Sequence, residues 1–105
     1  METDVYVEEM VRRITERFAP LRVILFGSRA RGTARLDNDI DLLVILPQVD
    51  NSRKAAVEIR RALADMPVGK DIIVSTPAEV SRFGNFVGPI LRSALQEGVV
   101  LYERS

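Results

Sequence analysis

Two short motifs in the first half of the chain contain residue types that can bind phosphate and a divalent metal. Gly27-Ser28 follows an apolar run, and ten residues later come the aspartates Asp39 and Asp41. A glycine–serine turn presents main-chain N–H groups and a hydroxyl to an anion, and Arg31 adds positive charge nearby. In this order and at this spacing, the two motifs predict chemistry on a nucleoside triphosphate.

The acidic pair begins a strongly apolar segment. Side chains of a strand alternate between its faces, so Asp39 and Asp41 are expected on one side and Ile40 on the other. Their Cα atoms should lie roughly 6–7 Å apart, which lets both carboxylates bind one metal ion or bridge two. Like charges beside a core are costly without a cation, which favours a metal site over two solvated residues. Asp37 has the same parity, but Asn38 offers no apolar anchor, so we expect Asp37 in the loop.

A third aspartate, Asp71, begins another apolar segment. If the two segments are neighbouring strands, its carboxylate can reach the same site. An equally weighted alternative is that Asp71 only caps the turn after Gly69. The glycine–serine turn is neither a P-loop nor a dinucleotide fingerprint, because no Gly-Lys-Ser/Thr follows and the glycine spacing differs.

The composition restricts both the metal and the class of protein. The chain of 105 residues has no cysteine and no histidine, which excludes disulfides, thiol catalysis and Cys/His zinc sites. Any metal is therefore a hard, oxygen-ligated ion, Mg²⁺ or Mn²⁺. Lys+Arg and Asp+Glu both number 15, and this zero net charge argues against a dedicated nucleic-acid binder. No apolar run reaches the roughly 20 residues that span a bilayer, and the acidic N-terminus lacks a signal-peptide pattern, so we expect a cytoplasmic protein.

Apolar periodicity predicts the elements that position these residues. Helical spacing alternates with short apolar runs, a pattern typical of helices packed on a sheet. We expect one domain over residues 1–105, with an α/β (α+β) fold and a small mixed sheet of about four strands. The predicted elements are a helix over 7–18, strands over 23–26 and 40–46, a helix over 51–66 capped by Asn51 or Ser52, a strand over 71–74, a short helix over 77–83, a helix over 87–95 and a strand over 99–102.

Together the motifs resemble the signature of the DNA polymerase beta-like nucleotidyltransferase superfamily. The string Gly27-Ser28, ten residues and then Asp39-Ile40-Asp41-Leu42 is similar to that signature, and the longer sequence resembles the minimal nucleotidyltransferases, the MNT group. The resemblance covers nearly the whole chain, including Glu97-Gly98-Val99-Val100-Leu101-Tyr102. It implies a nucleotidyltransferase fold and Mg²⁺-dependent transfer of a nucleoside monophosphate, AMP from ATP.

The resemblance also assigns roles to residues. Asp39, Asp41 and Asp71 match the metal-binding carboxylates, which would hold two Mg²⁺ ions, and Gly27 and Ser28 match the phosphate-binding turn. Many members carry serine at the position of Asn38, a departure that leaves the carboxylates intact.

A protein partner is a further implication of the resemblance. Larger members carry a helical domain that holds the base or the acceptor, whereas stand-alone domains work beside a helical HEPN protein as the antitoxin of a toxin–antitoxin pair. We therefore expect AMP transfer to a hydroxyl, a tyrosine, of such a partner. The alternative is a catalytically weak nucleotide-binding module that neutralises a HEPN toxin by direct binding. Both a homo-oligomer and a hetero-complex are compatible with the sequence, while no residues suggest a pocket for a small-molecule acceptor.

Overall fold

The computed structural model describes residues 5–27, 39–79 and 96–104. Its elements are α1 (Val5–Phe18), β1 (Arg22–Phe26), β2 (Ile40–Ile45), α3 (Ser52–Ala62), β3 (Lys70–Ser75) and β4 (Val99–Glu103). The chain is also helical at residues 77–79, where the predicted helix over 77–83 begins. The rest of that helix, and the helix predicted over 87–95, lie outside the described residues.

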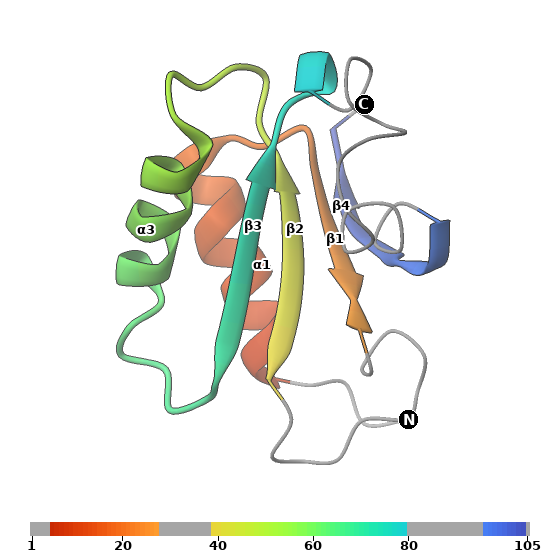
Figure 1. Ribbon diagram of the computed structural model, residues 1–105. Coiled ribbons are helices and arrows are strands. Elements are labelled where there is room, and N and C mark those ends of the chain that lie inside the picture. Colours follow the sequence, from red (N-terminus) through yellow and green to blue (C-terminus); the bar gives the residue numbers. More distant parts are fainter. Residues whose placement is uncertain (1–4, 28–38, 80–95, 105) are drawn as a thin grey trace.

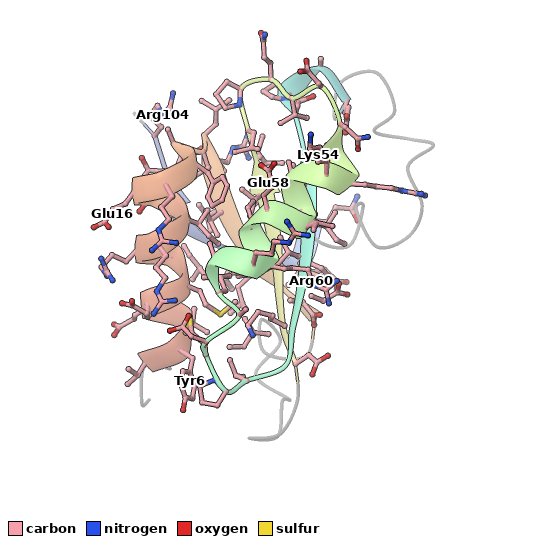
Figure 2. The ribbon with its side chains drawn as sticks, turned by 90° about the vertical axis from the view of Figure 1, so that its left-hand side faces the viewer. Tyr6, Glu16, Lys54, Glu58, Arg60 and Arg104 are labelled. Carbon is pink, nitrogen blue, oxygen red and sulfur yellow. The ribbon has the colours of Figure 1, made fainter. Side chains whose placement is uncertain are left out.

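The described strands form one mixed sheet in the order β3-β2-β1-β4 (Figure 1). β1 is antiparallel to both β2 and β4, whereas β2 and β3 are parallel and are connected through α3. α1 and α3 cover the same face of this sheet, and in Figure 2, which views the sheet from its edge, Glu16 of α1 points away from the strands. The predicted mixed sheet with helices packed on it is confirmed.

Apolar side chains are buried on both faces of the sheet. The face under the helices packs Leu42 and Val44 of β2 against Met10 and Ile14 of α1. A smaller group on the opposite face consists of Ile24, Phe26, Leu43 and Ile45. β2 is therefore covered on both sides, as its almost unbroken apolar sequence predicts.

The helix predicted over 51–66 is shorter in the structure. Asn51 is its N-cap, and the side-chain oxygen of Asn51 accepts a hydrogen bond from the Lys54 N–H at 3.1 Å. At the other end Leu63 leaves the helical conformation, with φ at −109°, and its N–H donates to carbonyls of the last turn. Pro67 disfavours helical backbone in the residue before it, which prevents the helix from reaching residue 66. The apolar periodicity therefore continues beyond the point where the helix ends.

Hydrogen-bonded ion pairs join α1 to the chain just after α3. Arg13 donates from Nη1 to Asp65 Oδ1 at 2.5 Å, from Nη2 to Asp65 Oδ2 at 3.1 Å, and from Nη1 to the Ala62 carbonyl oxygen at 3.1 Å. Its Nε donates to Glu9 Oε2 at 2.8 Å, and Arg12 donates to both carboxylate oxygens of Glu9. Hydrogen bonds from Arg12 and then Arg13 lower the pKa of Glu9 to about 2.

The stabilising contribution of Glu9 is expected to disappear in acid. The pKa of Glu9 falls from an ordinary 4.5 to about 2 on folding. Its contribution to the free energy of unfolding is therefore complete above about pH 4.5 and is lost as the pH falls through the pKa of the folded state. The effect should be small, because the pairs lie at the surface. Denaturant titrations of wild type and Glu9→Gln between these pH values check it, with Glu8→Gln on the same turn as the control. A stability difference that does not shrink toward low pH would contradict the expectation.

Candidate metal and nucleotide site

The strand register sets Asp41 between the end of β1 and the start of β3. Phe26 is opposite Asp41 in the antiparallel pair, and Asp71 is opposite Asp41 in the parallel pair. Neighbouring strands lie about 4.8 Å apart, so Asp41 and Asp71 are immediate neighbours across the sheet. Asp71 could reach the site only if its strand is next to the strand that follows Asp39. The register shows that the two strands are neighbours.

Asp41 and Asp71 belong to the sheet face opposite α1 and α3. Ile40 and Ile72 are part of the core under the helices, and strand alternation turns Asp41 and Asp71 to the opposite side. Asp41 is half-buried and Asp71 is exposed. Asp39 is also exposed and lies one residue before β2, at the start of the strand that the sequence predicts over 40–46.

Gly27 brings bare main chain against the Asp41 carboxylate. Its φ of +74° lies in the left-handed region, which residues with a side chain rarely adopt. A Cβ atom at this position would lie 3.2 Å from Asp41 Cγ and closer still to Oδ2. The glycine at the end of β1 is therefore required both by the backbone conformation and by the carboxylate beside it.

A second glycine has the same relation to Asp39. A Cβ atom at Gly69 would lie 2.9 Å from Asp39 Cγ and closer still to Oδ1. The Gly69 carbonyl accepts a hydrogen bond from the Ile40 N–H at 2.9 Å, which joins the two segments at this point. The sequence indicated only that Gly69 follows a helix. Its proximity to Asp39 results from the parallel pairing of distant segments, and no local pattern signals it.

The two glycines lie on opposite sides of β2. The Asp41 carboxylate rests against the end of β1, whereas the Asp39 carboxylate rests against the residue that precedes β3. Within residues 5–27, 39–79 and 96–104, no three acidic side chains stand close enough to form a ready-made metal cluster. As a donor set, however, these carboxylates supply the hard oxygen ligands that suit Mg²⁺ or Mn²⁺. Ser28 and Arg31 lie outside the described residues, so their phosphate contacts stay predictions.

Comparison with known protein families gives this arrangement a context. The sequence profile described as nucleotidyltransferase domain matches residues 7–101, a range that contains both glycines and all three aspartates. The chain belongs to the nucleotidyltransferase domain family. No curated protein matches it. None of the helices in the described part of this nucleotidyltransferase domain is long and apolar enough to cross a membrane.

Solved structures share the fold of this nucleotidyltransferase domain. A Sulfolobus solfataricus protein assigned as a nucleotidyltransferase aligns with a TM-score of 0.65 and 25% identity, over 94% of this chain and 78% of that one. A toxin–antitoxin complex with AMP-PNP gives 0.58 and 20%, over 93% and 74%. A complex of a tri-AMPylated Shewanella oneidensis HEPN toxin with an MNT antitoxin gives 0.54 and 16%, over 95% and 71%. The sequence profile confirms the predicted resemblance to nucleotidyltransferases, and these neighbours share the predicted fold.

Proposed function

We propose that the chain transfers AMP from ATP to a hydroxyl group of a helical HEPN protein, and that it is the antitoxin of that pair. The observation that carries the proposal is the register that sets Asp71 opposite Asp41, with Gly27 against the Asp41 carboxylate. Among the structural neighbours, one complex contains AMP-PNP and another contains an AMPylated HEPN toxin. Both support the choice of nucleotide and acceptor.

In this proposal Asp39, Asp41 and Asp71 hold Mg²⁺, and the bare main chain at Gly27 lets the triphosphate approach beside them. When bound there, Mg²⁺ would supply stabilisation of the charge that develops on the attacking and leaving oxygens of an in-line displacement. Ser28 and Arg31 bind the β- and γ-phosphates. Because Asp39 and Asp71 are exposed and Asp41 is half-buried, MgATP can reach these carboxylates from solvent.

The reaction is a displacement at the α-phosphorus of ATP. The acceptor hydroxyl oxygen forms a bond to this phosphorus, the bond from the phosphorus to the oxygen bridging the β-phosphate breaks, and pyrophosphate leaves. A carboxylate oxygen of Asp71 accepts the hydroxyl proton. Asp71 suits this role because it is exposed on β3, an outer strand of the described sheet, where a protein acceptor can approach.

The position of a label in ATP tests the proposed reaction. The chain is incubated with Mg²⁺, ATP and the helical protein encoded beside its own gene. We expect that protein to acquire label from the α-phosphate but none from the γ-phosphate, and we expect EDTA to abolish the labelling. Labelling from the γ-phosphate, or from neither position, would count against AMP transfer.

Neutralisation of the toxin by direct binding is the second candidate function. It is favoured by the apolar side chains of Val99 and Val100, which are 46% and 50% exposed on the two faces of β4, an outer strand of the described sheet that a partner can cover. In that case nucleotide would only adjust the affinity, and the aspartates could be changed without loss of protection. Replacing Asp39 and Asp41 together by asparagine distinguishes the two functions.

A further inference from the structure

Gly69, the residue before β3, lies directly against the side chain of Asp39. Gly69 is joined to β2 by the hydrogen bond from the Ile40 N–H at 2.9 Å, and the next residues, Ile40 and Lys70, are register partners. The distance between the main chain at Gly69 and the segment carrying Asp39 is therefore fixed by the sheet. Whatever occupies position 69 meets the Asp39 side chain directly.

Steric conflict at this position involves one side chain only. A Cβ atom at 69 would lie 2.9 Å from Asp39 Cγ and still nearer to Oδ1, closer than real Cβ contacts allow. Unlike Gly27, Gly69 does not have a left-handed φ, so an alanine there would not strain the backbone. Asp39 is exposed and its side chain is free to rotate away, which would relieve the conflict without unfolding the sheet.

We propose that Gly69 is a positioning residue for Asp39. Its bare main chain lets the Asp39 carboxylate lie toward β3, the strand that carries Asp71, whereas the Asp41 carboxylate lies toward Gly27. An alanine at 69 would turn the Asp39 carboxylate away from the strand of Asp71. The inference rests on the proposed function in so far as Asp39 is a metal ligand.

Manganese binding measures this role without nucleotide or acceptor. Mn²⁺ is titrated into wild type, Gly69→Ala, Asp39→Ala and the double variant, with binding followed by water-proton relaxation. We expect Gly69→Ala to weaken Mn²⁺ binding by about 10-fold or more, the range seen when groups that orient metal ligands are altered. Its melting temperature should stay close to that of wild type, because alanine in an ordinary backbone conformation does not strain the folded chain.

The double variant shows whether the effect passes through Asp39. In the Asp39→Ala background no carboxylate meets the new Cβ, so Gly69→Ala should leave Mn²⁺ affinity unchanged. Wild-type affinity in Gly69→Ala, an equal loss in the Asp39→Ala background, or no Mn²⁺ binding by wild type would each overturn the proposal. Wild type that binds Mn²⁺ but transfers no AMP would instead refute the proposed function and leave the role of Gly69 standing.

Discussion

Replacing Asp39 and Asp41 together by asparagine is expected to lower AMP transfer by about 10³-fold or more, because several kcal/mol of transition-state stabilisation depend on the metal ions that carboxylates hold. Asparagine has nearly the same shape, so the contacts with Gly27 and Gly69 should persist. Neither aspartate belongs to the hydrophobic core. The variant should therefore fold and bind its partner while losing transfer.

Initial rates of partner labelling, with circular dichroism as the test of folding, check this expectation. Asp50→Asn is the matched control, since Asp50 is an exposed aspartate beyond the opposite end of β2. Protection of cells from the toxin separates the two candidate functions. If the double variant transfers no AMP yet still protects, neutralisation by binding is supported. Transfer at the wild-type rate would exclude these carboxylates from the reaction.

Gly27→Ala should damage both stability and transfer. A left-handed conformation costs a residue with a side chain roughly 1–2 kcal/mol, and the φ of Gly27 is +74°. The new Cβ would also lie 3.2 Å from Asp41 Cγ and would displace that carboxylate. Because misplacing a reacting group by about 1 Å can cost 10²-fold in rate, we expect a loss of transfer of about that size.

Gly69→Ala provides a matched comparison for this variant. Both substitutions place a methyl group against an aspartate, but only position 27 has a left-handed backbone. Denaturant titration should therefore show a loss of stability for Gly27→Ala and little or none for Gly69→Ala. Equal stability of Gly27→Ala and wild type, together with equal transfer rates, would refute the requirement for glycine at the end of β1.

Local sequence patterns were enough to predict most of the described helices and strands. The apolar run after Asp39 predicted a strand over 40–46, and β2 covers Ile40–Ile45. The stripe of apolar residues before Pro20 predicted a helix over 7–18, and α1 covers Val5–Phe18. These predictions succeed because the signal lies within the element itself. The end of α3 was missed, because the apolar period continues after the backbone has left the helix at Leu63.

The site depends on contacts between distant segments, and there the sequence was less informative. Parity alone indicated that Asp39 and Asp41 face the same side. Asp71 lies opposite Asp41 because β2 and β3, which α3 connects, pair in parallel. From the sequence this pairing could only be assumed. The contact between Gly69 and Asp39 depends on the same pairing, and a lone glycine after a helix predicts only a turn.

The intact mass of the proposed HEPN partner after incubation with the wild-type chain, ATP and Mg²⁺ tests the central claim most directly. AMP transfer predicts that the partner gains the mass of one or more adenosine monophosphate groups, located on a hydroxyl-bearing residue such as tyrosine. The Asp39→Asn, Asp41→Asn variant should leave the mass of the partner unchanged. An unchanged mass with folded, partner-bound wild type, or the mass gain of a phosphate group alone, would contradict it.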